Sequence, residues 1–256
     1  MDSLAGKKIW VTGGAGYLGS AITSALDQQS AKVLCIDLPG RAEAFVRENN
    51  LNCTIPLTID MSDAAGLPKA IDDLVAKHGV PDGVVHLAFA SSGGKTLEEL
   101  SAEEFQKTFD HALTPAFVLC RSLAGHMKPQ GHGSIVLFSS MYGMVSPDPK
   151  VYRAPMKPNP IDYGASKAAI IQLTRYLAVH YGPSGLRFNS LAPGPFPNPA
   201  VQTAHPEFVA EIGQKTALGR IGQNAEIVGP TLFLLSDGAS FVTGHNLVVD
   251  GGWTAW

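Results

Sequence analysis

The sequence predicts an α/β fold in which a doubly wound parallel sheet of about seven strands carries helices on both faces. Short β-rich runs alternate with longer segments of helical spacing along the 256 residues. This alternation is typical of parallel sheets with right-handed crossovers. Several runs are continuously apolar, such as residues 135–138, as expected for strands buried on both faces. No shift in composition marks a second domain, so residues 1–256 are predicted to form one domain.

The elements follow from the local patterns in chain order. The predicted strands are 8–12, 32–36, 54–59, 83–88, 134–139, 186–191 and 246–249. The predicted helices are 18–28, 62–78, 101–127, 163–181 and 225–235. Two stretches are rich in proline and are expected to be irregular loops, 143–162 and 193–216. Both come after strands, and ligands bind at strand ends in open sheets, so these loops are expected to border the site.

Composition excludes several classes of protein. Hydrophobic residues make up 45% of the chain and charged residues 16%, enough apolar material for a sizeable core. The net charge of −3 provides no basic surface for nucleic acid. We find neither a signal peptide nor a membrane span, so a cytoplasmic location is expected. Cys35, Cys53 and Cys120 lack metal-ligand spacing and are expected to be free thiols, with no metal site.

A glycine-rich turn at residues 12–19 (TGGAGYLG) joins the first strand to the first helix. Gly14, Gly16 and Gly19 satisfy the G-x-G-x-x-G pattern, and Asp37 ends the next strand. Alone the glycine pattern is common, but with a strand before it, a helix after it and this acidic residue it indicates a Rossmann-type dinucleotide site. The missing side chains let a pyrophosphate reach N–H groups at the helix N-terminus, where the helix dipole favours negative charge.

Asp37 favours NAD over NADP. A carboxylate at this position accepts hydrogen bonds from the adenosine ribose and repels a 2′-phosphate. The residues that follow it are Leu38, Pro39 and Gly40, and the nearest cation in the sequence is Arg41.

Tyr163 and Lys167 form a candidate acid/base pair. Positions i and i+4 of a helix project from one face, so the two side chains are expected to point the same way. A free phenol titrates near ~10. A neighbouring ammonium and a positive nicotinamide ring are expected to lower this pKa, which allows the phenol to take a proton from an alcohol. The Y-x-x-x-K pattern also describes many solvated helix faces, but here Ser140 lies at the end of the preceding buried strand.

The chain resembles the short-chain dehydrogenase/reductase family over nearly its whole length. Matching segments occur in the family's order: TGGAGYLG, TIDMSD at 58–63, SSMYG at 139–143, YGASKAAI at 163–170, NSLAPG at 189–194 and SFVTGHNLVVDGGW at 240–253. The resemblance implies that Ser140 orients the reacting oxygen, Tyr163 is the acid/base, and Lys167 tunes it and holds the nicotinamide ribose. It places the cofactor against Gly13, Gly16, Tyr17, Leu18, Gly19, Asp37, Asp60, Met61, Ala88, Tyr163, Lys167, Pro193, Gly194 and Phe196.

Some segments depart from the compact branch of the family. The glycine spacing and VVHLAFA at 84–90, where that branch reads Asn-Asn-Ala-Gly, resemble the extended branch, yet the chain lacks that branch's additional substrate domain. Ala112 stands where the compact branch carries an asparagine that supports a proton relay, so either a water or His111 would replace it, or the relay differs. SSMYG, YGASK and the terminal VDGGWTAW are similar to oxidoreductases of bacterial sialic-acid-like sugar pathways, such as legionaminic acid synthesis.

These observations predict an NAD-dependent enzyme that interconverts a secondary alcohol and a carbonyl on a small-molecule substrate, expected to be a sugar, sugar derivative or polyol. Ser140, Tyr142 and Arg153 are candidate substrate residues. Lys150, Arg153 and Lys157 are expected to be surface charges, with attraction of an anionic group as the alternative. The alternatives are a nucleotide-sugar epimerase or dehydratase that retains NAD, and a non-catalytic dinucleotide sensor.

His86 and two tryptophans are expected to have structural roles or to line the cofactor site, without taking part in the reaction. His86 is expected to pack or to line the cofactor site. Trp253 and Trp256 are expected in a subunit interface, since the family typically forms dimers or tetramers.

Overall fold

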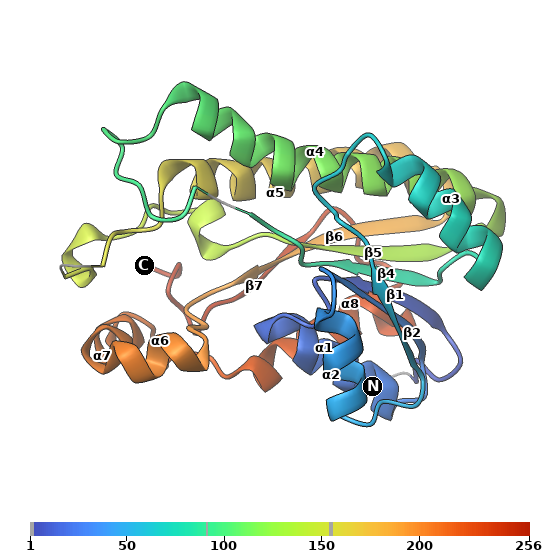
Figure 1. Ribbon diagram of the computed structural model, residues 1–256, viewed down its shortest axis with the longest axis horizontal. Helices are drawn as coiled ribbons and strands as arrows, with labels where there is room; N and C mark the ends of the chain where they lie inside the picture. Colours follow the sequence, from blue (N-terminus) through green and yellow to red (C-terminus); the bar gives the residue numbers. More distant parts are fainter. Residues whose placement is uncertain (1–2, 91, 154–155) are drawn as a thin grey trace.

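A seven-stranded, entirely parallel sheet forms the centre of the molecule (Figure 1). The computed structural model describes residues 3–90, 92–153 and 156–256. The strand order is β3-β2-β1-β4-β5-β6-β7, which confirms the predicted doubly wound sheet. The strands are β1 (Lys8–Thr12), β2 (Lys32–Asp37), β3 (Thr54–Thr58), β4 (Gly83–His86), β5 (Gly133–Phe138), β6 (Leu186–Pro193) and β7 (Asn246–Val249).

Helices cover both faces of this sheet. They are α1 (Tyr17–Gln28), α2 (Arg41–Glu48), α3 (Leu67–His78), α4 (Ala102–Met127), α5 (Ile161–Tyr181), α6 (Pro199–Ala204), α7 (Pro206–Gln214) and α8 (Val228–Leu235). Helices α3, α4 and α5 lie on one face, and α1 and α8 lie on the other (Figure 1). Successive residues of β1 show why both faces are apolar, because Trp10 packs into the core under α3–α5 and Val11 into the core under α1 and α8.

Three helices lie where none was predicted. Helix α2 begins after Gly40, whose φ of 78° is a left-handed conformation that glycine adopts readily. Segment 193–216 is not a loop throughout, because it contains α6 and α7. Both of these helices begin with a proline, which is tolerated in the first helical turn, so prolines that suggested a loop mark helix starts instead.

Two predicted helices also differ in extent. The one expected over 62–78 begins at Leu67, because Asp60 and Asp63 accept local hydrogen bonds from Ser62 and Gly66 and hold the preceding residues in turns. The one expected over 225–235 is divided into a 3₁₀ turn, Asn224–Ile227, and the short helix α8.

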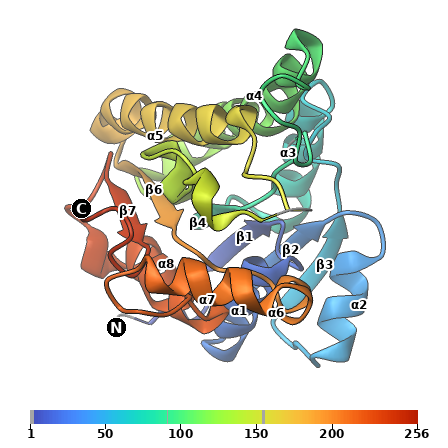
Figure 2. The same cartoon turned by 90° about the vertical axis from the view of Figure 1, so that its left-hand side faces the viewer.

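The segments at the carboxyl ends of the strands enclose the site. The chain after β4, the segment 143–162 and helices α6 and α7 gather on the left of Figure 1, and this side faces the viewer in Figure 2. Within 143–162 the described residues are largely irregular, apart from the 3₁₀ turn Pro149–Val151 and the first residues of α5. No helix in the described ranges is both long and apolar enough to cross a membrane.

Trp253 is buried without a subunit interface, which corrects the expectation for this residue alone. It is buried within its own chain, in a small cluster with Met141, Tyr142, Val151 and Ile212. The second tryptophan, Trp256, is 79% exposed. All three cysteines are free, as expected, and Cys35 and Cys120 are buried.

Candidate active site

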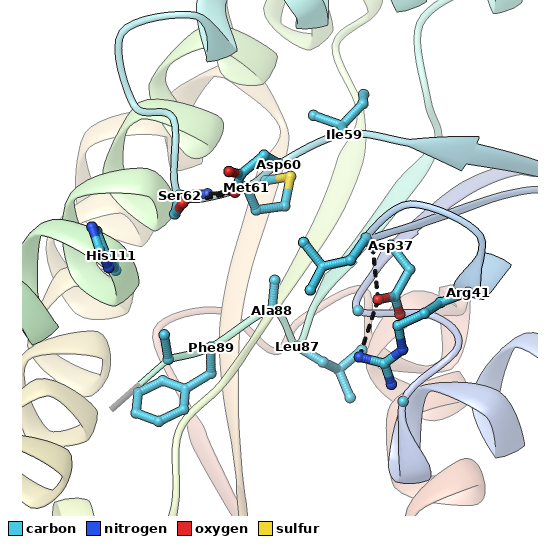
Figure 3. Close-up of a pocket in the computed structure, with 14 residues that line it drawn as sticks. Asp37, Arg41, Ile59, Asp60, Met61, Ser62, Leu87, Ala88, Phe89 and His111 are labelled. Atoms are coloured by element: carbon cyan, nitrogen blue, oxygen red, sulfur yellow. Dashed lines mark hydrogen bonds and ion pairs between the residues drawn. The ribbon is translucent and has the colours of Figure 1, made fainter. Parts of the chain in front are cut away.

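Two adjoining hollows lie at the carboxyl edge of the sheet and have Gly13, Gly16, Leu87 and Phe89 in common. The first, of about 430 Å³, includes Asp37, Asp60, Met61 and Ala88 in its lining (Figure 3). The second, of about 600 Å³, is lined by Tyr17, Leu18, Gly19, Ser140, Tyr163, Lys167, Pro193, Gly194 and Phe196, among others. Every residue predicted to bind the cofactor therefore lines this continuous groove, although these residues come from widely separated parts of the chain.

The last glycine of the turn, Gly19, has no space for a side chain. A Cβ atom built on Gly19 would lie 2.1 Å from the carbonyl oxygen of Gly13, so glycine is required at this position. Helix α1 starts directly after Gly16, and no side chain of the described residues caps it. The first backbone N–H groups of α1 thus remain available to an anion, as a dinucleotide pyrophosphate requires.

Asp37 connects the glycine turn to β2. Its carboxylate accepts hydrogen bonds from the backbone N–H of Ala15 at 2.9 Å and of Leu38 at 2.8 Å. Arg41 lies 3.5 Å from the same carboxylate and also lines the first hollow (Figure 3). A ribose at this end of the groove would meet a carboxylate already held in position by two backbone donors.

Ser140 is brought to α5 by a close backbone contact. The 3₁₀ turn Met141–Gly143 packs so tightly on α5 that a Cβ on Gly143 would lie 2.8 Å from the carbonyl carbon of Lys167. The buried Ser140 hydroxyl accepts a hydrogen bond from the N–H of Tyr142 at 3.1 Å. This bond fixes the serine oxygen at the edge of the hollow that Tyr163 and Lys167 also line.

Lys167 is buried and is held at the end of β5. Its Nζ donates to the carbonyl oxygen of Phe138 at 2.9 Å, and Ser139 Oγ donates to the carbonyl oxygen of Lys167 at 3.0 Å. The amine lies 5.9 Å from the centroid of the Tyr163 ring, so the two side chains share one face of α5 as predicted from their spacing. Burial lowers the pKa of Lys167 to about 7.

Burial raises the pKa of Tyr163 in the chain alone, because it disfavours the phenolate. A hydrogen bond with the Ser140 side chain opposes this effect without reversing it. The predicted lowering of this pKa includes the charge of a bound nicotinamide, so it stays a prediction for the complex with cofactor.

Asp162, next to Tyr163 in the chain, is a supporting residue that sequence reasoning missed. This completely buried carboxylate accepts hydrogen bonds from Ser92 N at 3.0 Å, from Ser92 Oγ at 2.9 Å and from Thr108 Oγ1 at 2.5 Å. It joins the chain after β4, helix α4 and the first turn of α5, directly beside Tyr163. No motif marked it, because its partners lie 54 and 70 positions away along the chain.

Tyr142 and Arg153, which were predicted to contact the substrate, lie in different parts of the structure. The Tyr142 hydroxyl lies 2.9 Å from that of Tyr152 in a partly buried pair, and neither tyrosine is among the residues that line the two hollows. Arg153 does not line the groove. It forms ion pairs with Glu207 and Glu211 of α7 and lines a separate hollow of about 320 Å³.

Two cations of segment 143–162 form ion pairs at the surface, as expected of surface charges. Lys157 pairs with Glu99 at 2.6 Å, and Arg153 pairs with carboxylates of α7. These ion pairs make both cations less available to an anionic group.

The histidines occupy distinct environments. His111 lines the hollow that contains Asp37 and is not among the residues that line the part around Tyr163, so its predicted part in a proton relay stays a prediction. His86 is buried, as expected of a packed residue, and its Nδ1 lies 2.7 Å from Thr12 Oγ1. Its Nε2 has no hydrogen-bond partner among the described residues.

The fold and this groove define a Rossmann-type α/β protein. A family model described as enoyl-(acyl carrier protein) reductase matches residues 14–254. The chain is 30% identical over 247 residues to cis-4-hydroxycyclohexanecarboxylate dehydrogenase of Sinomonas cyclohexanicum, covering 96% of this chain and 95% of that protein. It is 30% identical over 250 residues to a probable galactose dehydrogenase of Rhizobium meliloti, covering 95% and 93%.

A solved structure agrees with these sequence matches. A short-chain dehydrogenase from Leptospira borgpetersenii with bound NAD+ superimposes with a TM-score of 0.85 at 30% identity, covering 98% of this chain and 93% of that one. The protein belongs to the short-chain dehydrogenase/reductase family of oxidoreductases.

Proposed function

We propose that this protein is an NAD-dependent dehydrogenase or reductase that interconverts a secondary alcohol and a carbonyl group. The observation that carries this proposal is the convergence of Ser140, Tyr163 and Lys167 on the groove that the glycine turn also lines. A dinucleotide laid along this groove from Asp37 would bring its reactive end to these three residues. A non-catalytic sensor would not need a serine, a tyrosine and a lysine at this point.

Each residue has a defined part in the reaction. Ser140 donates a hydrogen bond to the substrate oxygen and orients it, since its hydroxyl is held at the edge of the hollow. Tyr163 takes the alcohol proton as the carbonyl forms, and returns it in the reverse direction. Lys167 supplies positive charge that favours the phenolate of Tyr163. The bound nicotinamide supplies the hydride acceptor or donor.

NAD is the proposed cofactor, with NADP disfavoured. The Asp37 carboxylate supports this choice, because it would repel a 2′-phosphate and accept hydrogen bonds from ribose hydroxyls. The related Leptospira structure, which contains bound NAD+, is consistent with it.

The proposed substrate is a neutral sugar, sugar derivative or polyol. The ion pairs of Arg153 and Lys157 leave few free cations for an anionic substrate. The similarity to a probable galactose dehydrogenase points to the same class.

A substrate screen tests the proposal. Purified protein is mixed with NAD and with sugars, polyols or their phosphates, and reduced nicotinamide is followed by absorbance. Turnover of a neutral carbohydrate is the expected result. Turnover of steroids or acyl thioesters alone would overturn the substrate class. Tightly retained NAD with no net reduction would instead indicate an epimerase or dehydratase.

The protein is further proposed to form a homo-oligomer, a dimer or tetramer. Helices α4 and α5 pack side by side and expose Phe117, Tyr176 and Val179, with Tyr176 67% and Val179 81% exposed. Apolar groups gathered on neighbouring helices are typical of contact surfaces. Sedimentation velocity should show a species at least twice the 27.0 kDa chain mass, and a monomer at micromolar concentration would contradict this proposal.

A further inference from the structure

The amine of Lys167 is buried next to an aromatic ring that the mechanism does not use. Phe89 follows β4, and the centroid of its ring lies 4.2 Å from Lys167 Nζ. This is closer than the 5.9 Å that separates the amine from the Tyr163 ring centroid. Phe89 also meets Tyr163 directly, with ring centroids 5.0 Å apart and an interplanar angle of 87°. One phenylalanine therefore contacts both members of the acid/base pair.

The surroundings of Lys167 make this contact important. Lys167 Nζ donates a hydrogen bond to the Phe138 carbonyl oxygen. Among the described residues, no carboxylate lies within ion-pair distance of this amine. Burial without a counter-ion disfavours the ammonium form. The face of an aromatic ring attracts a cation, most strongly where water is excluded. Phe89 thus compensates part of the loss of hydration of this charge.

A ring has an advantage over an acceptor oxygen at this position. An ammonium has three N–H donors, and one of those of Lys167 is used by Phe138. A carboxylate or carbonyl in place of Phe89 would occupy a second donor of the amine. A ring face attracts the charge without fixing a donor in the same way, so the remaining N–H groups stay free for a ligand in the groove.

We propose that Phe89 is a positioning residue of the active site, whose ring face keeps the Lys167 amine charged and directed at Tyr163. This inference rests on the role of Lys167 in the proposed function. The ring is a feature of this chain and not of the compact branch of the family. Phe89 occupies the glycine position of the Asn-Asn-Ala-Gly segment that VVHLAFA replaces. A glycine there would offer Lys167 no ring.

Two other titratable groups lie near this amine. Tyr163 projects from the same helix, and the buried imidazole of His86 on β4 lies close enough for the Lys167 charge to affect its pKa. Burial, and the nearby Lys167 charge, lower the pKa of His86 to about 3, so His86 stays neutral through the range in which Lys167 titrates. Changes in the Lys167 titration between pH 5 and 9 can therefore be assigned to Phe89 or Tyr163.

The test is a direct titration of Lys167 by NMR in protein labelled with ¹³Cε-lysine, with the resonance assigned from a Lys167→Arg sample. Phe89→Leu keeps apolar bulk and removes the ring. It is expected to lower the pKa of Lys167 by roughly one unit, while Phe89→Tyr stays close to wild type. Phe89→Met serves as a second non-aromatic variant if Phe89→Leu fails to fold.

A matched control exists on the outer surface. Arg121 Cζ lies 5.1 Å from the centroid of the Phe117 ring on α4, so Phe117→Leu removes a comparable cation–π contact away from the groove. It should leave the Lys167 titration unchanged. An unshifted titration in Phe89→Leu, or equal shifts in Phe89→Leu and Phe89→Tyr, would overturn the role of Phe89.

The outcome is separable from the proposed function. Unchanged turnover in Tyr163→Phe would overturn the proposed function, and with it the catalytic meaning of Phe89, whatever the titration shows. Normal dependence on Tyr163 with an unshifted titration would overturn the inference about Phe89 alone. With a substrate identified, Phe89→Leu is expected to lower kcat and to move the acid limb of the pH profile for alcohol oxidation, and Phe89→Tyr should restore both.

Discussion

Replacing Asp37 by asparagine tests how the protein selects its cofactor. Asp37→Asn removes one negative charge but keeps an oxygen that can accept from the Ala15 or Leu38 N–H. Hydrogen bonds to charged groups contribute about 1.5–3 kcal/mol, roughly twice the neutral value. Neutralising Asp37 should therefore cost the ribose about 1–2 kcal/mol, a loss of roughly tenfold in NADH affinity.

The effect on NADPH should have the opposite sign. Two like unit charges about 4 Å apart repel by about 4 kcal/mol at an effective dielectric constant of 20. Arg41, 3.5 Å from the carboxylate but 53% exposed, offsets part of this repulsion. We expect the wild type to favour NADH by roughly 100-fold or more, and Asp37→Asn to reduce this preference to about tenfold or less.

Isothermal titration calorimetry with NADH and NADPH measures both affinities without any substrate. Arg41→Ala is the matched control, since it removes the cation beside Asp37 and should weaken NADPH binding more than NADH binding. Thermal unfolding of each variant checks that the turn held by Asp37 is intact. Equal affinities in the wild type, or an unchanged ratio in Asp37→Asn, would refute the electrostatic reasoning.

Three further predictions concern proton transfer, packing and pH. Tyr163→Phe removes the transferable proton and should lower kcat by roughly 10²–10⁴-fold with an unchanged calorimetric Kd for NADH; full turnover would exclude Tyr163 as the acid/base. Asp162→Ala leaves the donors on Ser92 and Thr108 unpaired, at a cost of about 2–4 kcal/mol and roughly 5–15 °C in Tm, whereas Asp162→Asn should lose less; calorimetric melting that matches wild type would contradict this. The lowered pKa of His86, about 3 against an ordinary value of 6.5, means that the unfolded chain binds its proton more readily. Stability should therefore fall as pH drops from 6.5 towards 3, and urea unfolding of His86→Asn should show a shallower fall, while parallel curves would argue against it.

The sheet was predictable because burial on both faces leaves a strong sequence signal. All seven strands were found, since a strand such as β5 is apolar along most of its length. The short helices α6 and α7 were missed for a physical reason. Each begins with a proline, and composition alone does not distinguish a proline in the first turn of a helix from one in a loop.

The residues of the site also fall into those that the sequence predicted and those that it did not. The glycine turn and the Tyr163–Lys167 pair were predictable because each depends on local geometry along a few residues. Phe89 and Asp162 were not, because their roles arise from contacts between elements distant in sequence. The separation of Arg153 from the groove was missed for the same reason, as its partners lie on α7, which the sequence did not reveal.

The opposite pKa shifts of Tyr163 and Lys167 have a common cause and a consequence for catalysis. Burial raises the pKa of the phenol and lowers that of the amine, so each group by itself favours its neutral form. A phenolate beside an ammonium holds the same number of protons as a phenol beside a neutral amine, because a single proton has moved between them. The first proton lost by the pair therefore belongs to neither residue alone. Under the proposed mechanism, activity depends on which of the two arrangements prevails. Any group that stabilises the ammonium, as proposed for the Phe89 ring, favours the arrangement in which Tyr163 is the base.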